Sequence, residues 1–488
     1  MELLERLEIS VLSFSEFLTD NADFRLDAEY FLKENLNKLN KLKQVGYKKI
    51  SEFCYVTDGI HTSIDYCDES SINLFSATTP RENYFDLSRQ VFISEKAQLA
   101  NPRTALKEND VIISTVGTIG NCAVVDKSLL PANSDRHVGI IRLEKDFYPR
   151  YLSTFLLTKY GRFQTWREST GNVQLNLFLY RIRTLKIANL SLSFQSKIED
   201  LVLINDVKRK KSKATYTQAE TLLLHEIGLN QDIKNTVSNL PLATSINVKS
   251  FKGSFGITGR LDAEYYQPKY EAIIEKIKSQ KYDFLHNIVT ITKSIEPGSD
   301  YYSDDEIGLP FMRVADYNKF GLSEPNKKLT LEFIKDNQDK IDELKPQKGS
   351  ILFSKDGSVG TAYHLREDFE GITSSAILNL KVKNEKEIIP EYLTLALNSK
   401  LVQMQAERDA GGSIILHWRI GEIKNVIVPI IDYTKQQQIA KLIEESFSLK
   451  KQSEHLLEVA KRAVEIAIEE NEGIAMKYIE GNCGAKLM

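Results

Sequence analysis

Short apolar runs closed by glycine, proline, asparagine or aspartate recur along the chain. Examples are Asp110–Ser114, Val138–Arg142 and Ser350–Ser354. Runs of this length that are rich in β-branched residues and bounded by turn-forming residues are typical of buried strands. The pattern predicts a mixed α/β fold for most of the chain.

Two segments differ from this pattern because they are rich in Lys, Glu, Leu, Ala, Gln and Ser and contain neither proline nor internal glycine. They run from Ser196 to about residue 228 and from Gln436 to about residue 470. This composition is typical of long helices. A helix of roughly 33 residues is about 50 Å long and is marginal without a partner. We therefore expect the two helices to pack against each other, antiparallel and coiled-coil-like. The alternative is two surface helices that lie on separate cores.

Heptad spacing supports a helix pair unevenly. In the second segment, the seam that starts at Ile439 is small and apolar: Leu442, Ser446, Leu449, Ser453, Leu456, Ala460, Ala463 and Ala467. In the first segment, the seam is polar in its middle: Ile198, Leu201, Asn205, Lys208, Ser212, Thr215, Ala219 and Leu222. We expect the pair to meet best toward its ends. The residues expected to bind a partner are Ile198, Leu201, Leu222, Leu442, Leu449 and Leu456.

The chain contains an internal repeat. The hexamer Arg-Leu-Asp-Ala-Glu-Tyr occurs at Arg25–Tyr30 and again at Arg260–Tyr265. Further matches follow in order: a Gly-x-x-Gly loop, a Pro-x-Tyr-Leu string and a Gln-x-x-Ile string, each offset by 240 or 241 residues. This period is far longer than the roughly 20 to 50 residues of solenoid repeats, so it indicates two tandem copies of a whole unit. Two such units are expected to form a pseudo-two-fold pair, whose target need not be symmetric.

Composition excludes several classes of protein. The 488 residues are 42% hydrophobic and 27% charged, which suits a soluble globular protein. No apolar run approaches the roughly 18 to 20 residues of a membrane span, and the N-terminus lacks the pattern of a signal peptide. We therefore expect a cytoplasmic protein. The four cysteines show no Cys-x-x-Cys spacing, so neither a zinc site nor a disulfide framework is expected.

Charge is distributed unevenly although the net charge is only -3. Between residues 151 and 196, six of the seven charged residues are basic: Lys159, Arg162, Arg167, Arg181, Arg183 and Lys186. Asn172, Gln174 and Asn176 lie in the same stretch, and such side chains contact phosphates and base edges. The equivalent stretch of the second copy is charge-balanced, with Arg408, Ser413, His417 and Arg419 as its candidates. A solvated basic surface is the plainer explanation of the same pattern.

Each copy has a glycine-containing loop after a predicted strand, Ser114–Asn121 and Ser354–Thr361. Glycines three apart among hydroxyl residues allow backbone N–H groups to converge on an anion, so the loops are candidates for phosphate contact. They lack the GxxxxGK[ST] pattern of nucleotide-binding loops, and a single Gly-x-x-Gly is more often a tight turn. The duplication strengthens the prediction because both copies keep the spacing while they change the residues between the glycines.

Catalytic patterns are missing from the sequence. The seven histidines show no metal-binding spacing, and no Gly-x-Ser-x-Gly string occurs. The chain is therefore expected to be a binding protein without catalytic residues, metal or cofactor.

The order of these motifs resembles the specificity subunit of Type I restriction-modification enzymes. The residues that carry the resemblance are Thr57–Thr62 and Gly308–Arg313, together with the repeated Gly-x-x-Gly, Pro-x-Tyr-Leu and Gln-x-x-Ile strings. The resemblance spans about residues 9 to 475. The helix starts depart from the family pattern, since Phe194-Gln195 and Lys435-Gln436 stand where a Glu-Gln pair is usual.

The resemblance implies an α+β fold with two pseudo-two-fold related target-recognition domains, separated by two long antiparallel helices. The expected boundaries are 1–195 and 259–435 for the recognition domains, 196–230 and 436–475 for the helices, 231–258 for the connection and 476–488 for a C-terminal tail. It also implies a non-catalytic subunit that recognises a bipartite, asymmetric site in double-stranded DNA. Two methylation subunits, expected to use S-adenosylmethionine, would dock on it, and restriction subunits would join through them, in a role in phage defence.

The DNA-binding candidates combine the basic stretch, the glycine loops and the strings that carry the resemblance. They are Gly59, His61, Thr62, Ser114, Thr115, Gly117, Thr118, Gly120, Arg162, Arg167, Asn172, Gln174, Asn176, Arg181, Arg313, Ser354, Lys355, Gly357, Ser358, Gly360, Arg408, Ser413, His417 and Arg419. Two alternatives remain open at this point. One is a protein-binding scaffold built on the paired helices that ignores DNA, and the other is a pseudodimeric enzyme of unknown chemistry.

Overall fold

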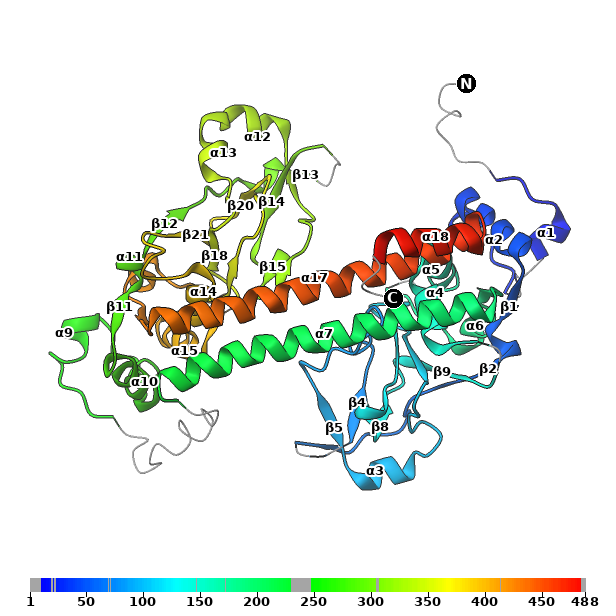
Figure 1. The fold of residues 1–488 in the computed structure, drawn as a ribbon, viewed down its shortest axis with the longest axis horizontal. Helices are drawn as coiled ribbons and strands as arrows, with labels where there is room; N and C mark the ends of the chain where they lie inside the picture. The colour runs from blue at the N-terminus through cyan, green and yellow to red at the C-terminus, as the bar shows by residue number, and fades with distance from the viewer. Residues whose placement is uncertain are drawn as a thin grey trace. The chain divides into compact units, whose positions relative to one another are not determined.

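The structure, a computed structural model, describes the chain except for residues 1–9, 19, 20, 22, 69, 71, 146, 172, 230–246, 304–306, 413 and 484–488. The chain forms two compact units. Unit 1 comprises residues 1–209 and 450–488, and unit 2 comprises residues 210–449. The division falls within two long helices, α7 (Leu192–Glu226) and α17 (Tyr433–Glu469), so each helix contributes one part to each unit (Figure 1).

Unit 1 is built around an antiparallel sheet in the order β2-β9-β6-β7. Its strands are β2 (Cys54–Asp58), β9 (Val138–Leu143), β6 (Val111–Ser114) and β7 (Cys122–Val124). All residues of β6 and β7 are buried, as the apolar runs in the sequence predict. Helix α4 (Pro149–Leu157) packs against β6 and β7, and α5 (Lys159–Arg167) packs against α4.

A second sheet of unit 1 has the order β3-β5-β4-β8, in which β4 and β8 run parallel. Its strands are β3 (Tyr66–Cys67), β5 (Val91–Ile93), β4 (Asn73–Phe75) and β8 (Ala132–Ser134). A two-stranded ribbon pairs β1 (Tyr47–Lys49) with β10 (Lys186–Ala188).

Unit 2 repeats this topology strand for strand. Its main sheet has the order β12-β21-β18-β19, its second sheet β13-β17-β14-β20, and its ribbon pairs β11 with β22. The bounds are β12 (Val289–Lys293), β21 (Ile377–Val382), β18 (Ile351–Ser354), β19 (Ala362–His364), β13 (Tyr302–Ser303), β17 (Lys328–Leu329), β14 (Leu309–Met312), β20 (Ile372–Thr373), β11 (Tyr282–Phe284) and β22 (Ile427–Pro429). Unit 2 also has a small hairpin of β15 (Tyr317–Asn318) and β16 (Gly321–Leu322).

The remaining α-helices lie before the first strand, between the strands and after α17. They are α1 (Phe14–Leu18), α2 (Lys33–Val45), α3 (Glu95–Ala100) and α6 (Leu179–Ile182) in unit 1, α9 (Phe255–Thr258), α10 (Pro268–Lys278), α11 (Leu285–Ile288), α12 (Leu331–Asp336), α13 (Gln338–Leu344), α14 (Pro390–Asn398), α15 (Lys400–Asp409) and α16 (Ile420–Lys424) in unit 2, and α18 (Glu472–Cys483) at the C-terminal end of unit 1. Short 3-10 turns are η1 (Ala28–Phe31), η2 (Ile50–Glu52), η3 (Lys127–Leu129), η5 (Ser299–Tyr301) and η6 (Val314–Asp316).

The mixed fold and the two long helices confirm the fold class expected from the sequence. The helix bounds differ by a few residues from the expected ones. The first helix begins at Leu192 rather than at residue 196, and the second ends at Glu469 rather than at residue 475. Asn471 separates α17 from α18, because its side chain accepts a hydrogen bond from the Ile474 N–H at 3.0 Å and so starts a new helix.

The C-terminal segment 476–488, expected to be a tail, is helical as far as Cys483. Ala475, Ile479 and Cys483 of α18 are buried in the main core of unit 1. Leu456 and Ala460 of α17 lie in the same core, whereas Ile439 and Ile443 lie in the core of unit 2. The compact units therefore divide inside the helices and not at the connection 231–258, which lies largely outside the described residues.

Polar residues in the middle of the helix pair are buried and hydrogen-bonded, which corrects the expectation that the helices meet best toward their ends. In unit 1, the Asn205 side chain donates to the Ser453 carbonyl at 2.6 Å. In unit 2, Ser212 and Ser446 each donate to the other's carbonyl at 2.8 Å. Under the 241-residue offset of the repeat, Asn205 corresponds to Ser446 and Ser212 to Ser453. The two contacts are therefore equivalent, and small hydrogen-bonded residues of this kind specify the register of a helix pair.

The repeated strings outside the loops hold the fold together. Tyr151 and Tyr392 of the Pro-x-Tyr-Leu strings are fully buried, and their hydroxyls donate to the carbonyls of Ala188 and Pro429 in the ribbons, at 2.7 and 2.6 Å. The glutamine of each Gln-x-x-Ile string ties the long helix to the segment before α4 or α14. The Gln195 side chain accepts from the Tyr148 N–H at 3.1 Å, and its counterpart in unit 2 accepts from the Ile389 N–H at 3.0 Å.

Candidate functional site

The two glycine loops, glycine loop 1 (residues 114–121) and glycine loop 2 (residues 354–361), have the same backbone conformation. Gly117 and Gly357 both have φ of 71°, and Gly120 and Gly360 both have φ of 80°. A Cβ atom at Gly120 would lie 2.7 Å from the Thr165 hydroxyl of α5. Glycine is therefore required both by the positive φ and by the close packing of α5.

In both glycine loops, backbone N–H groups donate hydrogen bonds to carbonyl or hydroxyl oxygens of the protein. In glycine loop 2, the Gly357 N–H donates to the Leu416 carbonyl at 2.8 Å, the Gly360 N–H to the Ser354 carbonyl at 2.8 Å, and the Thr361 N–H to the Ser354 hydroxyl at 2.9 Å. In glycine loop 1, the Gly120 N–H donates to the Ser114 carbonyl at 3.0 Å. These bonds close a rigid turn and do not support the expected phosphate cradle, since N–H groups that already have an acceptor are not available to an anion.

A second loop follows α5 in unit 1 and α15 in unit 2, which we call tip loop 1 (residues 170–176) and tip loop 2 (residues 411–417). Each is closed by a pair of backbone hydrogen bonds between its ends, 3.0 and 2.8 Å in tip loop 1 and 3.1 and 2.7 Å in tip loop 2. Each is also bonded to its glycine loop. The Leu177 N–H donates to the Thr115 carbonyl at 2.9 Å, and the Trp418 N–H donates to the Lys355 carbonyl at 2.7 Å. The glycine loop therefore serves as the base on which the tip loop is held.

The tip loops present different side chains from the same backbone. Val173 of tip loop 1 is fully exposed, and its counterpart in tip loop 2, Ile414, is 95% exposed. Gln174 is exposed and Asn176 is half-buried, and the equivalent positions hold Ile415 and His417. The His417 ring lies 2.8 Å from a carboxylate oxygen of Asp356. Asn172 and Ser413, both predicted to contact DNA, lie outside the described residues.

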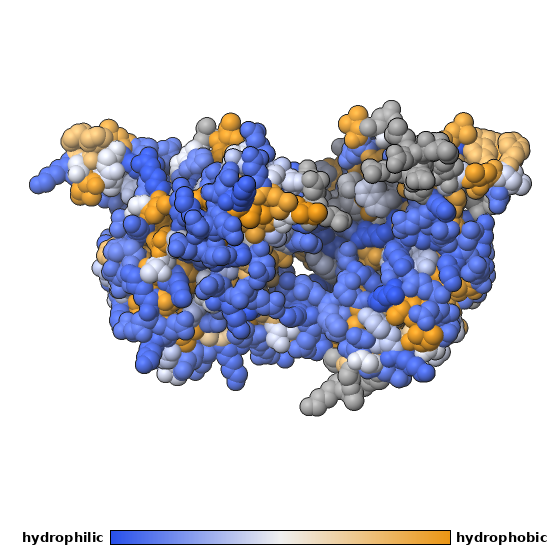
Figure 2. Space-filling model, turned by 90° about the horizontal axis from the view of Figure 1, so that it is seen from above, coloured by the Kyte–Doolittle hydropathy of each residue, from blue (hydrophilic) through white to orange (hydrophobic). Residues whose placement is uncertain are grey.

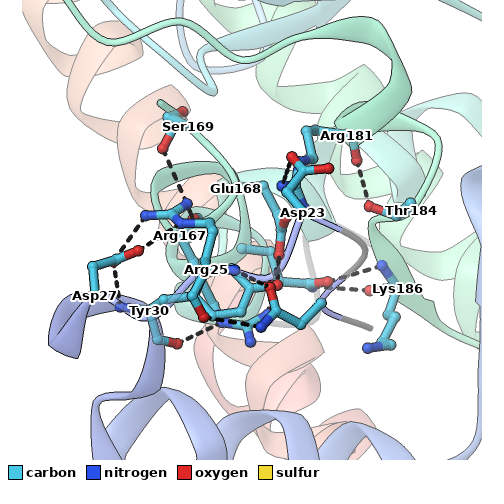
Figure 3. A network of polar contacts seen from close by, with 12 residues as sticks. Asp23, Arg25, Asp27, Tyr30, Arg167, Glu168, Ser169, Arg181, Thr184 and Lys186 are labelled. Carbon is cyan, nitrogen blue, oxygen red and sulfur yellow. Dashed lines mark hydrogen bonds and ion pairs between the residues drawn. The ribbon is translucent and has the colours of Figure 1, made fainter. Parts of the chain in front are cut away.

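The repeated hexamer forms a cluster, which we call clamp 1, at the base of tip loop 1 (Figure 3). The Tyr30 ring lies close to two guanidinium groups, that of Arg167 at 3.5 Å and that of Arg25 at 4.7 Å from the ring centroid. The Tyr30 hydroxyl donates to Glu168 at 3.2 Å, and Arg25 donates to the Arg167 carbonyl at 2.6 Å. Burial and the neighbouring Glu168 carboxylate raise the pKa of Tyr30 to about 12. Because Arg167 and Glu168 end α5, clamp 1 holds the N-terminal segment of unit 1 against the start of tip loop 1.

Unit 2 contains an equivalent cluster, clamp 2, formed around the second hexamer. The Tyr265 ring lies 4.6 Å from the guanidinium of Arg260 and 5.0 Å from that of Arg408. Arg260 donates to the Asp409 carbonyl at 3.1 Å, and Arg408 pairs with the Asp409 carboxylate at 2.7 Å. Two cations over one tyrosine face are each worth about 0.5 to 2 kcal/mol. The hexamer therefore has a structural role that the sequence alone did not reveal, although its duplication was the available signal.

Two of the predicted DNA contacts of unit 1, Arg167 and Arg181, are engaged inside the molecule. The side chains of Arg167 and Arg181 are only 5% and 4% exposed, and both pair with Glu168. Arg181 also pairs with Asp23 (Figure 3). A guanidinium that is buried and paired with carboxylates is not free to neutralise a phosphate, since breaking a buried pair is costly. In unit 2, Arg408 is engaged in the same way through Asp409.

Arg162, also predicted to contact DNA, is directed at glycine loop 1. Its guanidinium donates to the Ile119 carbonyl at 3.3 Å and to the Asn121 side chain at 2.8 Å, and it pairs with Glu82 at 3.0 Å. These contacts hold the loop and leave the side chain 24% exposed.

The other candidates are spread over each unit. His61 and Thr62 are exposed, and His61 pairs with Asp58. Gly59 lies so close to the Asp135 carbonyl that a Cβ would not fit. Arg313 is paired with Asp316 at 3.7 Å, whereas the side chain of Arg419 is exposed. Ser114, Thr115 and Ser354 are buried, Gly117, Gly357 and Ser358 are exposed, and Thr118 and Lys355 are half-buried.

The residues predicted to bind a partner are mostly inside the molecule. Ile198, Leu201 and Leu456 are no more than 2% exposed and belong to the core of unit 1. Leu222 and Leu442 are half-buried and pack against the core of unit 2. A partner has no access to the first three, because the spacing that suggested them marks the seam between the helices. Leu449 is half-buried.

A different set of apolar residues is exposed at equivalent places in both units. In unit 1 they precede and include the hexamer, with Phe14, Phe24 and Leu26 at 75%, 65% and 82% exposure. In unit 2 the corresponding residues include Phe251 at 68% and Leu261 at 66%. Figure 2 shows hydrophobic patches of this kind on a surface that is otherwise mostly hydrophilic. In the part of the chain that the structure describes, no helix is both long and apolar enough to span a membrane.

Residues 285–459 match the family model described as "Type I restriction modification DNA specificity domain". Nearly all of this segment lies in unit 2. The match confirms, over this segment, the resemblance noted in the sequence. No curated protein matches the sequence.

Two solved structures illustrate the likeness. The Type-I restriction-modification system S subunit from M. genitalium is 13% identical, with 89% of this chain and 95% of that chain covered and a TM-score of 0.38. The HsdS subunit from Thermoanaerobacter tengcongensis is 13% identical, with 90% and 97% covered and a TM-score of 0.26.

Proposed function

We propose that the chain is the DNA sequence-recognition subunit of a Type I restriction-modification complex, in which each unit recognises one half of a bipartite, asymmetric duplex site. One observation supports this above the others. The two units hold their tip loops on the same backbone, with equivalent clamps and glycine loops, and present different exposed side chains from it. Two domains that recognise different DNA sequences require the same supporting backbone and different exposed side chains.

The chemistry of the tip loops suits contact with base edges. Gln174 and Asn176 offer amide donors and acceptors, which pair with adenine, and His417 and Arg419 of unit 2 offer donors to guanine or to phosphate. The apolar tips Val173 and Ile414 suit the methyl group of thymine. The surface around these tips supplies the phosphate contacts that set the orientation of each unit on the duplex.

Exchange of the tips tests this proposal. Val173→Ile, Gln174→Ile and Asn176→His together place the side chains of Ile414, Ile415 and His417 on tip loop 1, and Leu175 already equals Leu416. We expect the complex with its methylation subunits to change one half of the methylated sequence and to keep the other half, as base-resolution methylation mapping would record. The reciprocal exchange, Ile414→Val, Ile415→Gln and His417→Asn, serves as the matched control and should alter the other half. If neither exchange alters the site, the tip loops do not recognise DNA.

We propose further that the helix pair sets the gap between the half-sites. Residues 207–210 of α7 and 448–451 of α17 are equivalent, and both lie between the two polar contacts of the seam. Removing both segments shortens the pair by about 6 Å, or about 2 base pairs at 3.4 Å each, and keeps the pairing of Asn205 with Ser453. Methylation mapping should then show a shorter gap. Removing residues 207–210 alone puts the two helices out of register and should destabilise the helix pair instead. An unchanged gap in the double deletion would contradict a spacer role.

The partner subunits belong to the proposal as well. We infer that two methylation subunits, which would use S-adenosylmethionine, dock on the exposed apolar residues that accompany the two hexamers, and that restriction subunits join through them in the cytoplasm. Two equivalent apolar surfaces on one chain suit two copies of one partner.

Leu26→Ser and Leu261→Ser, singly and together, test the docking surfaces. Each single variant should remove one methylation subunit from the complex, as measured by mass photometry, and the double variant should remove both. Leu203→Ser, at an exposed apolar position on α7, is the matched control and should leave the stoichiometry unchanged. Two subunits still bound to the double variant would place the docking surface elsewhere.

A protein-binding scaffold without DNA recognition remains the second candidate, because the exposed apolar residues favour protein partners. The scaffold and the DNA-recognition subunit differ in one expected outcome. A scaffold complex would show no preference for any split oligonucleotide over a scrambled duplex of the same length.

A further inference from the structure

His364, Glu391 and Glu444 come together in unit 2 from three separate elements. His364 is the last residue of β19, Glu391 the second residue of α14, and Glu444 lies on α17. One nitrogen of the histidine and one oxygen of each carboxylate all lie within 4.8 Å of one another. No spacing in the sequence suggested this set, and the sequence had predicted no metal site, because the three residues are far apart along the chain.

His364 is buried and lacks hydrogen-bond partners. The residue is 8% exposed, and neither ring nitrogen has a hydrogen-bond partner. Its Nδ1 lies 3.4 Å from Glu391, too far for a good hydrogen bond. A buried imidazole without partners is unusual, since buried polar groups are nearly always satisfied. Burial and the nearby Arg366 lower the pKa of His364 to about 4.

A small cavity of about 10 Å³ lies beside His364 and Glu391, which is room for about one water-sized group. His364, Glu391, Arg366, Thr394 and Phe447 are among its lining residues. Arg366 pairs with Glu444 at a nitrogen–oxygen distance of 2.9 Å. The Arg366 guanidinium also lies 3.5 Å from the Phe447 ring centroid. Lys319, the other cation at the cavity, is already paired with Glu220 at 3.0 Å. A bound cation would displace Arg366 from Glu444 and leave it stacked on Phe447.

We propose that His364, Glu391 and Glu444 bind one divalent transition-metal ion, with Zn²⁺ as the best fit. One imidazole nitrogen and two carboxylate oxygens are a ligand set that suits Zn²⁺, whereas Mg²⁺ prefers oxygen ligands alone. The ion would join the main sheet of unit 2, through β19, to α14 and to the long helix α17. It would therefore fix the recognition domain of unit 2 on its own part of the helix pair.

Unit 1 provides an internal comparison. The equivalent positions hold Val124, Arg150 and Leu203, none of which is a metal ligand. Arg150 instead pairs with Glu199 of α7 at 3.0 Å. Unit 1 therefore joins α4 to its long helix with an ion pair, at the place where unit 2 has the proposed ion site.

The test is a Zn²⁺ titration of the full-length chain, stripped of metal, in competition with a chromophoric chelator, with Mg²⁺ in parallel. Glu444→Gln removes a ligand at the exposed helix surface, and Glu445→Gln, its neighbour on α17, is the matched control that loses a charge but no ligand. We expect the wild type and Glu445→Gln to bind one tight equivalent of Zn²⁺, and Glu444→Gln to bind it at least about tenfold more weakly. Mg²⁺ should not compete.

His364→Val installs the residue of unit 1 and should abolish the tight site while the fold is kept, as measured by circular dichroism. Other histidine–carboxylate pairs at the surface are present in every variant, so only the difference between variants reports this site. Equal Zn²⁺ stoichiometry and affinity in the wild type and Glu444→Gln would overturn the proposal, as would a wild type that binds no Zn²⁺. Neither result bears on DNA recognition.

Discussion

Arg162 of unit 1 and Gln403 of unit 2 occupy equivalent positions in α5 and α15, and both support a glycine loop. Arg162 donates to the Ile119 carbonyl at 3.3 Å, and Gln403 donates to the Gly360 carbonyl at 2.7 Å. One side chain is charged and the other is neutral, yet both donate a hydrogen bond to a backbone carbonyl of the glycine loop. The comparison indicates that the task at this position is to hold the loop, and that the positive charge of Arg162 is incidental to it.

A comparison of the interior with the tip loops shows a second contrast. Tyr151 and Tyr392 are identical in the two units, and both are buried and hydrogen-bonded. Gln174 and Ile415 differ between the units, and both are exposed in the tip loops. Duplicated units that must keep one fold and acquire two specificities are expected to diverge in this way, because buried positions tolerate few changes and exposed ones tolerate many.

The largest expected difference between the units is at the clamps. Tyr30 is fully buried, whereas Tyr265 is half-buried, and Arg408 lies 5.0 Å from the Tyr265 ring centroid where Arg167 lies 3.5 Å from that of Tyr30. Tyr30→Ala should cost about 3 to 5 kcal/mol in unit 1, and Tyr265→Ala should cost roughly half as much in unit 2. Hydrogen exchange at α5 and α15, which reports each unit separately, would measure both. Equal losses would show that the clamps are equivalent in energy as well as in composition.

Glycine substitutions should separate the two positions within one loop. Gly120→Ala adds a Cβ that meets the Thr165 hydroxyl, at a positive φ, and should cost about 2 to 3 kcal/mol. Gly117→Ala has the same sign of φ but open space around the Cβ, so about 1 kcal/mol is expected. Gly360→Ala should fall between them, because there the Cβ meets the end of the flexible Gln403 side chain. Chemical denaturation would rank the three, and equal costs for Gly120→Ala and Gly360→Ala, whose φ is the same, would mean that φ and not the space around the Cβ decides the cost.

Arginine substitutions should divide phosphate contacts from structural ones. Arg419 of unit 2 is exposed, and its counterpart in unit 1 is Phe178. Arg419→Ala should reduce the slope of log affinity against log salt by about 1, because one phosphate contact is lost. Arg162→Ala should leave that slope unchanged. The measurement is DNA binding by the complex with its methylation subunits at several salt concentrations, and a flatter slope for Arg162→Ala would restore it as a phosphate contact.

The smallest expected effect is the loss of clamp stability in acid. Hydrogen bonds from Arg25 and Arg260 lower the pKa of Asp27 and Asp262 below the usual 3.8. A carboxylate with a lowered pKa contributes stability that is present above the unfolded value and is lost as the pH falls through the folded value. Both clamps should therefore weaken together below about pH 4. Asp27→Asn and Asp262→Asn should reduce this pH dependence in thermal unfolding, by a small amount because both side chains are partly exposed.

Sequence reasoning succeeded where the information was local or repeated. The apolar runs predicted β6, β9 and β18, and the composition predicted α7 and α17 to within a few residues at their starts. It failed where a side chain depends on a distant partner. Arg167 appeared to be a candidate for phosphate contact, because nothing near it in the sequence shows that Tyr30, more than 130 residues earlier, covers its guanidinium.

Two polar residues in the middle of α7 show the same limit of prediction from the sequence. Asn205 and Ser212 looked like weak points for helix packing, since the sequence lists side chains without their neighbours. In the structure each meets a serine of α17 and is satisfied. A polar residue in a seam destabilises it only when it has no partner, and a partner more than 230 positions away is not visible in a heptad pattern.

The amino-acid sequence by itself determined that this protein consists of two copies of one α/β unit with a long helix at the end of each, because periodicity, turn residues and repetition are local properties of a chain. Only the tertiary structure decided which charged side chains are engaged inside the molecule, which loops are held out to solvent, and that ligand atoms of His364, Glu391 and Glu444 lie within 4.8 Å of one another. Those outcomes depend on burial and on contacts between distant segments, and the free energy of a charge or a polar group is set by those surroundings and not by its place in the chain.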